Sequence, residues 1–108
     1  IMINSKIIEI LQPLNIPIHW MEHSGDDVEY IIFQTNNAND INYSDDTASN
    51  ENIEIGLIYW FKSPAGASKI DEIKRLMKEE KFIKLNERDM KDEDFYGRSF
   101  RYRLVKDL

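Results

Sequence analysis

The chain of 108 residues has no cysteine, two histidines, three prolines and only four glycines. Without cysteine it can form neither a disulfide framework nor a thiolate metal centre, and the redox compartment stays open. The four glycines are isolated, so the sequence contains no glycine-rich phosphate-binding loop. No stretch approaches the roughly 20 apolar residues of a membrane-spanning helix. These absences leave a domain that must be held together by an ordinary hydrophobic core.

Positive charge is also scarce, since 14 Lys and Arg face 20 Asp and Glu and give a net charge of −6. Nucleic-acid-binding proteins usually present a basic face, so we expect no sequence-specific nucleic-acid partner. Lys6 and Glu9 interrupt the first apolar segment, which is atypical of a secretory signal and favours cytoplasmic synthesis. With 42% hydrophobic residues, the composition predicts one folded domain over residues 1–108.

The first third of the chain predicts a helix followed by two strands. Apolar residues at spacings of three and four indicate a helix over residues 3–12, which Pro13 should end. Short strands are predicted at residues 18–22 and 29–35, with the turn-forming Ser24-Gly25-Asp26-Asp27 between them. We expect these two strands to form a hairpin.

Residues 36–50 contain five Asn and three Asp with few apolar residues, and we predict a long polar loop. A strand over residues 52–62 follows, with a clear alternation of apolar side chains. Its predicted core face consists of Ile53, Ile55, Leu57, Tyr59 and Phe61. Ile58 and Trp60 fall on the opposite face, which suggests that another surface covers part of it.

The last third predicts a second helix and a final strand. Ser68 and Asp71 match a capping box at the start of a helix that ends near residue 80, and Asp71 is spaced for an ion pair with Arg75. A short strand is expected at residues 82–85, a charged linker at 86–94 and a strand at 95–105. Together these elements predict an α+β fold. We expect a mainly antiparallel sheet of four to five strands with two helices on one face.

Arg101 and Arg103 alternate with aromatic residues in the final strand. Interleaved arginines and aromatics are also typical of single-strand nucleic-acid platforms, but alternation places the two sets on opposite faces. We therefore favour a core strand whose arginines pair with carboxylates such as Glu54, either across the sheet or across a subunit boundary.

No set of residues predicts catalysis or a cofactor. His19 and His23, with Asp26 and Asp27 nearby, contain metal-ligating groups, but their spacing is not a zinc motif, and we favour solvent-exposed histidines. The acidic runs lack the alternating ligand pattern of a calcium loop and are interpreted as solvated: they are Asp45-Asp46 and Asp92-Glu93-Asp94. Carboxylates without a nucleophile or oxyanion donor do not make an active site, so we predict that the chain is not an enzyme, with no cofactor and no metal.

An ordered set of features resembles one family, the tail-terminator or head–tail joining proteins of long-tailed bacteriophages and prophages. The features span residues 30–104. In order, they are the Tyr30-Ile31-Ile32-Phe33 strand, Tyr43-Ser44-Asp45-Asp46, the Ile53 to Phe61 strand entering Lys62-Ser63, Ile73-x-x-Leu76-Met77 followed by Phe82, and Tyr96 with Phe100-x-Tyr102. Family members often have glycine before that Phe, where this chain has Lys81.

The resemblance implies a self-assembling ring, expected to be a hexamer, at the head-proximal end of a phage tail. Such a ring ends tail-tube polymerisation and joins tail to head, in the cytoplasm of the bacterial host and then in the virion. Its partners would be the tail-tube and head-connector proteins, and an acidic lumen would repel passing DNA. The residues expected at interfaces are Tyr43, Asp45 and Asp46 in the loop, Ile58 and Trp60 on the sheet, and Arg101 and Arg103 in intersubunit ion pairs.

The alternative function is that of a small acidic binding module, of the immunity-protein or antitoxin type, that masks a basic partner.

Overall fold

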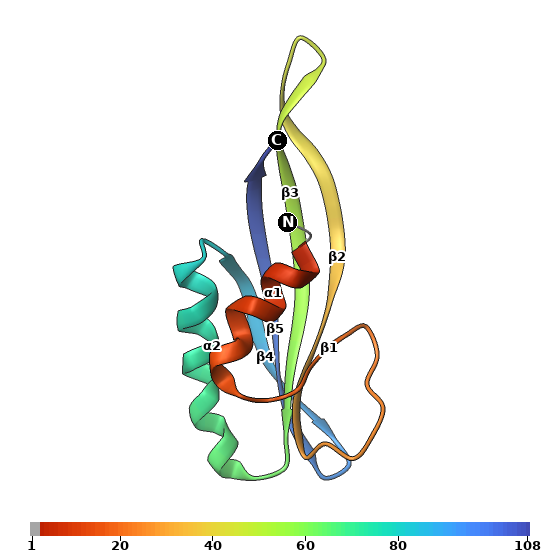
Figure 1. Ribbon diagram of the computed structural model, residues 1–108, viewed down its shortest axis with the longest axis vertical. Coiled ribbons are helices and arrows are strands. Elements are labelled where there is room, and N and C mark those ends of the chain that lie inside the picture. Colours follow the sequence, from red (N-terminus) through yellow and green to blue (C-terminus); the bar gives the residue numbers. More distant parts are fainter. Residues whose placement is uncertain (1–2) are drawn as a thin grey trace.

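Five strands form one twisted sheet, and two helices pack on one of its faces, which confirms the predicted α+β class (Figure 1). The computed structural model describes residues 3–108. The elements are α1 (Ile3–Leu11), a 3-10 turn η1 (Gln12–Leu14), β1 (Ile18–Trp20), β2 (Glu29–Ser44), β3 (Thr47–Phe61), η2 (Pro64–Ala67), α2 (Ser68–Glu79), β4 (Ile83–Asp92) and β5 (Phe95–Asp107). The strand order is β1-β2-β3-β5-β4. All neighbouring strands are antiparallel except β1 and β2.

The core lies between the helices and the side of the sheet that the sequence predicted. All five predicted β3 residues are buried, and they share one cluster with apolar residues of α1, α2 and β5. The cluster includes Ile7, Leu11, Ile31, Phe33, Ile55, Leu57, Tyr59, Ile73, Met77, Phe100 and Tyr102. Helices on a single face leave the other face without a covering layer among the described residues.

The predicted hairpin between the first two strands is wrong, because β1 pairs with β2 in parallel, with Ile18 opposite Ile31. The eight residues 21–28 can span up to roughly 26–29 Å, whereas β1 covers only about 10 Å. The chain therefore returns to the starting end of β1 before β2 begins. Met21 fixes the departure from β1, since its N–H donates to the Phe33 carbonyl at 2.9 Å.

The predicted polar loop at residues 36–50 is also wrong, because it forms the outer part of the β2–β3 hairpin. Asp45 and Asp46 form its two-residue turn with φ values of 50° and 63°, the positive values that type I′ hairpin turns require. Side-chain amides link the strands, with Asn42 donating to Asn50 at 2.8 Å and Asn50 donating to Asp107 at 2.7 Å. The predicted charged linker at 86–94 is wrong for the same reason, since residues 86–92 belong to the edge strand β4.

The start of α2 differs from the predicted capping box. A 3-10 turn, η2, precedes the helix, and the Ser63 hydroxyl accepts from the Ala65 N–H at 3.3 Å one turn earlier. Ser68 instead donates its hydroxyl to the Ala65 carbonyl at 3.1 Å. Arg75 pairs with Glu79 at 2.8 Å, rather than with Asp71.

The exit from α2 places a lysine where glycine is preferred. Lys81 has a φ of 71°, and the hydrogen bonds Lys81 N–H to Lys78 carbonyl (3.0 Å) and Phe82 N–H to Met77 carbonyl (3.1 Å) form a Schellman motif. A side chain in the left-handed region costs roughly 1 kcal/mol relative to glycine. We expect Lys81→Gly to raise the free energy of unfolding by about 0.5–1 kcal/mol, measured by urea denaturation.

The control for this variant is Lys78→Gly, which removes the same side chain from the last turn of the same helix. Glycine there should destabilise the protein by about 0.5–1 kcal/mol. Opposite signs at the two positions would show that backbone conformation, and not lysine charge, sets the effect. A loss of stability in Lys81→Gly would contradict the prediction.

Candidate functional site

The side of the sheet opposite the helices, called the open face below, is the first candidate surface. Strand pairing assigns to it Tyr30, Ile32 and Gln34 of β2, Gly56, Ile58 and Trp60 of β3, and Gly97, Ser99, Arg101 and Arg103 of β5. Ile58 and Trp60 lie at its centre and are only half-buried. The prediction that these two residues point away from the core is confirmed.

Trp60 is held by close packing against β5. Its indole lies over Gly97, where the Cβ of any larger residue would come within 2.7 Å of the Trp60 Cζ3 atom. Phe95 meets the indole edge-to-face at 6.4 Å between ring centroids. Any side chain at position 97 would displace the indole. Glycine at this position therefore makes room for Trp60, a large apolar residue that is partly exposed.

A β-bulge shapes the open face beside Ile58. The β2–β3 register shifts between Thr35 and Asn37, and the Asn36 side chain accepts from Gln34 Nε2 at 3.0 Å. Asn36 covers Gly56 so closely that a Cβ there would lie 3.0 Å from its Nδ2 atom. The groove next to this bulge is lined by Ile32, Gln34, Gly56, Ile58, Ser99 and Arg101.

The two predicted interface arginines have partners within the chain. Arg101 Nη2 lies 3.4 Å from Glu54 Oε1, which is the across-sheet pairing that the sequence suggested. Arg103 donates from Nε to the Oδ1 atom of Asn52, a side chain that is 8% exposed. The Arg101 side chain is still 51% exposed, so its guanidinium can reach a second carboxylate from outside.

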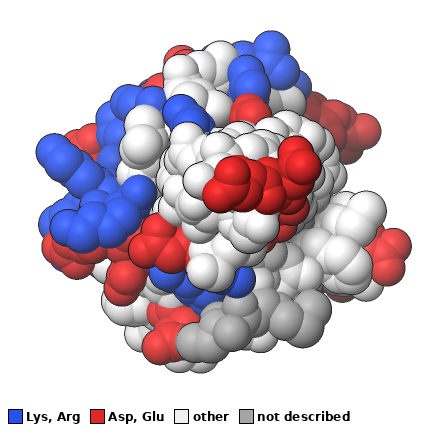
Figure 2. All heavy atoms as spheres, turned by 90° about the horizontal axis from the view of Figure 1, so that it is seen from above, with Lys and Arg blue, Asp and Glu red and all other residues white. Residues whose placement is uncertain are grey.

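The tip of the hairpin is the second candidate surface. Tyr43 is 63% exposed, and Asp45 and Asp46 in the turn are exposed as well. Seen from above, acidic side chains occupy the end of the molecule and uncharged ones surround them (Figure 2). Residues 36–50 carry three acidic and no basic side chains. Since Tyr43 pairs with Ala48, 12 residues before Trp60, the tip lies about 40 Å from Trp60 along β3.

Between α2 and β4, on the helix side of the sheet, lies an ion-pair network that the sequence did not predict. Glu87 contacts Lys74 at 3.1 Å, Lys84 at 2.5 Å and the Arg98 guanidinium. Hydrogen bonds from Lys84, Lys74 and Arg98 outweigh burial and lower the pKa of Glu87 to about 2. Its members come from three separate segments, so no local pattern reveals it. Its role is to hold the edge strand β4 against α2.

Tyr59 and Glu29 form a second, partly buried contact that the sequence did not predict. The Tyr59 hydroxyl donates to the Glu29 carboxylate, and Lys69 donates to the same carboxylate at 2.8 Å. Burial and the Glu29 carboxylate raise the pKa of Tyr59. The neutral phenol therefore serves as a structural donor that ties β3 to the start of β2.

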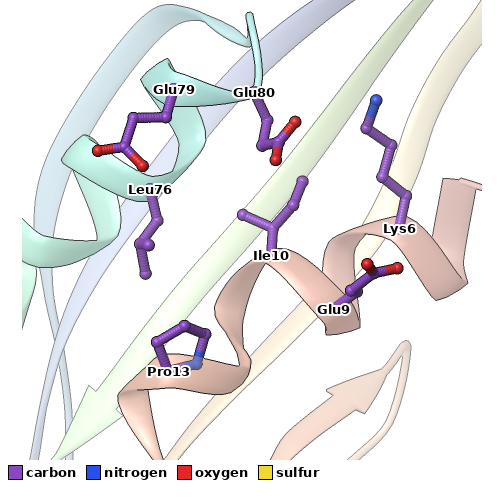
Figure 3. A pocket seen from close by; sticks show the side chains of 7 residues that line it. All are labelled: Lys6, Glu9, Ile10, Pro13, Leu76, Glu79 and Glu80. Atoms are coloured by element: carbon purple, nitrogen blue, oxygen red, sulfur yellow. The ribbon is translucent and has the colours of Figure 1, made fainter.

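A hollow between the two helices is the third feature (Figure 3). Ile10 and Leu76 face each other across it, and the charged residues at its rim are Lys6, Glu9, Glu79 and Glu80. Within residues 3–108, its lining includes no histidine, serine or threonine.

The two histidines do not lie exposed as predicted. His19 and His23 are both partly buried, and each places its Nε2 atom within 3.3 Å of the same Asp27 oxygen. Among residues 3–108, His19, His23 and Asp27 form a group whose ligand atoms lie within 4.8 Å of one another, close enough to share a metal ion.

Comparison of the chain with protein-family models and with curated proteins gives no match. Within residues 3–108, neither helix is long and apolar enough to cross a membrane. The hairpin tip and the open face are the two exposed surfaces that the chain offers to a partner among residues 3–108 described above.

Proposed function

We propose that the chain is a ring-forming assembly protein of the tail-terminator or head–tail joining type. The observation that carries the proposal is the pair of different surfaces, the acidic hairpin tip and the arginine-bearing open face, about 40 Å apart along one strand. Contacts between unlike patches are heterologous. They close into a ring when the rotation that relates one subunit to the next is a whole-number fraction of a full turn. A symmetric dimer would need only one of these patches.

Charge complementarity supports contact between the hairpin of one subunit and the open face of the next. The hairpin residues 36–50 contribute a charge of −3, which is half of the net charge of the chain. The open face offers Arg101, whose side chain is 51% exposed, beside the apolar Ile58 and Trp60. An apolar centre with a charged neighbour is a typical interface composition.

The hairpin itself favours a role in assembly. Beyond the Asn50–Asp107 pair it consists of two strands only, and a lone two-stranded ribbon is marginally stable in water. Contact with a neighbouring subunit or with the tail tube would bury Tyr43 and order the ribbon. In the ring, acidic side chains outside this contact would line a channel that lets DNA pass without binding it.

The direct test is the mass of the protein by light scattering over a concentration series, with magnesium present. A species near six times the subunit mass of 12.8 kDa would support the ring. Arg101→Glu should weaken assembly by a salt-dependent amount, because it places like charges at the contact. A stable dimer would contradict the proposal. A strict one-to-one complex with a basic protein would favour the alternative, an acidic masking module.

A further inference from the structure

Two histidines and one aspartate converge beside Tyr30, at the end of the open face nearest β1. His19 Nε2 lies 3.3 Å and His23 Nε2 lies 3.2 Å from Asp27 Oδ2. The three ligand atoms all lie within 4.8 Å of one another. We propose that His19, His23 and Asp27 form a binding site for a divalent transition-metal ion, with Zn²⁺ as the ion that fits best.

Two of the three separations between the ligand atoms are close to those of zinc coordination. Zinc binds histidine nitrogen at about 2.0–2.1 Å and carboxylate oxygen at about 2.0–2.2 Å, usually as a tetrahedron. Neighbouring ligands of such a tetrahedron are about 3.3–3.5 Å apart. The two nitrogen–oxygen separations at Asp27 already have nearly these values. Three protein ligands leave the fourth position for water or for a group from another molecule.

The two imidazole rings are held in place by aromatic packing. His23 stacks on Tyr30 with 3.7 Å between centroids and 5° between planes, and Phe95 supports Tyr30 from the side at 5.9 Å. His19 meets the His23 ring edge-on at 4.9 Å. The His23 side chain is only 14% exposed and that of His19 is 31% exposed. Ligands fixed in this way lose little freedom when an ion binds.

An unusual backbone turn produces the convergence. Met21 has a φ of 67°, and the Glu22 N–H donates to the Trp20 carbonyl at 2.8 Å. This is a γ-turn of the rare positive-φ kind, which is strained for a bulky residue. In an extended strand His23 would lie about 13 Å from His19, whereas the turn brings the rings into contact. Strained backbone of this kind is concentrated at binding sites.

The ligand chemistry selects the class of ion. Two imidazoles and one carboxylate suit zinc, nickel, cobalt or copper, whereas calcium and magnesium require six or more oxygen ligands.

The contrasting explanation is metal-free, with Asp27 Oδ2 accepting a hydrogen bond from each imidazole. Adjacent aspartates in the chain separate the two explanations. Asp27→Asn replaces the anionic carboxylate ligand with a neutral, weakly ligating amide, and Asp26→Asn makes the same change at an exposed neighbour outside the cluster. Both variants change the net charge equally, so a general electrostatic effect would appear in both.

The experiment is calorimetric titration of ZnCl₂ into the full chain and into both variants. We expect one ion per chain, affinity reduced by at least about tenfold in Asp27→Asn, and unchanged affinity in Asp26→Asn. Zinc at 100 times its Kd should also raise the unfolding midpoint of the unaltered chain and of Asp26→Asn by more than about 5 °C. Ca²⁺ and Mg²⁺ should neither bind in the titration nor raise the unfolding midpoint.

A spectroscopic measurement keeps the proposal testable even if Asp27→Asn folds poorly. Co²⁺ bound in a tetrahedral nitrogen–oxygen site absorbs visible light, so the unaltered chain and Asp26→Asn should develop this absorption and His23→Gln should not. Absence of zinc binding to the unaltered chain, or equal affinities in Asp26→Asn and Asp27→Asn, would overturn the proposal. The proposal is independent of ring formation, because all three ligands belong to one chain.

Discussion

Replacing Glu87 by glutamine is expected to lower the free energy of unfolding by about 2–3 kcal/mol at neutral pH. Glu87 is 15% exposed and accepts charge-assisted hydrogen bonds from Lys74, Lys84 and Arg98. The variant leaves two lysines and an arginine without their shared carboxylate. It should therefore loosen the attachment of β4 to α2.

The pH dependence of the effect follows from the lowered pKa. Glu87 has a pKa of about 2 in the folded protein against an ordinary value of 4.5. A difference of this size corresponds to about 3 kcal/mol, reduced by solvent around the partly exposed lysines. Because the folded-state pKa is depressed, the stabilisation is complete above pH 4.5 and is lost as the pH falls toward 2. The stability gap between the unaltered chain and Glu87→Gln should therefore close over this range.

Glu79→Gln provides the matched control. Glu79 pairs with Arg75 at 2.8 Å on the exposed side of α2, and both side chains are more than half exposed. Such a pair contributes only a few tenths of a kcal/mol. Urea denaturation of both variants at pH 7 and at pH 3 tests the difference. Equal and small effects in the two variants would show that the Glu87 network adds no more than an ordinary surface pair.

The elements with one buried face were predictable from the sequence. The β3 strand from Ile53 to Phe61 alternates because its odd positions contact the helices and its even positions do not. The stripe of α2, comprising Ile70, Ile73, Leu76 and Met77, is buried for the same reason. From these elements the class of fold and the outward direction of Ile58 and Trp60 follow.

The outer hairpin and β4 were not predictable, because neither has a well-buried face. Ala38, Ile41 and Ala48 carry too little apolar surface to give the hairpin a period of two, and β4 is mostly charged and exposed. Backbone hydrogen bonds to a neighbouring strand hold both segments, and such pairing leaves no pattern in side chains. A two-residue Asp-Asp turn was the one local signal, since Asp tolerates positive φ.

The candidate sites likewise include residues that the sequence predicts and residues that it does not. The sequence identified Ile58 and Trp60 on the open face, because their direction follows from alternation within one strand. The distance of about 40 Å between these residues and the hairpin tip was not predictable, because residues 36–50 have the composition of a loop and form two extended strands instead. The histidine cluster depends on a left-handed Met21, a residue type that rarely adopts this conformation. No propensity rule predicts such a turn.

Shortening the hairpin is expected to abolish the proposed ring assembly and leave the fold intact. Asp40 and Glu51 are paired across β2 and β3, so residues 41–50 can be replaced by an Asn-Gly turn that preserves the register. The buried core lies outside the deleted segment. Thermal unfolding should shift by no more than a few degrees, and light scattering should show the mass of one subunit at every concentration.

The matched control for this variant keeps the hairpin at full length and changes only its turn, Asp45→Asn with Asp46→Gly. Both variants lose the two acidic side chains of the turn, and both contain the Asn-Gly sequence that favours type I′ geometry. If the ribbon itself carries the contact, the full-length control still assembles, with weaker dependence on salt. If charge at the tip carries it, both variants remain monomeric. Assembly of the shortened chain into the same ring would show that the hairpin is not part of the interface and would contradict the proposed contact between the hairpin and the open face.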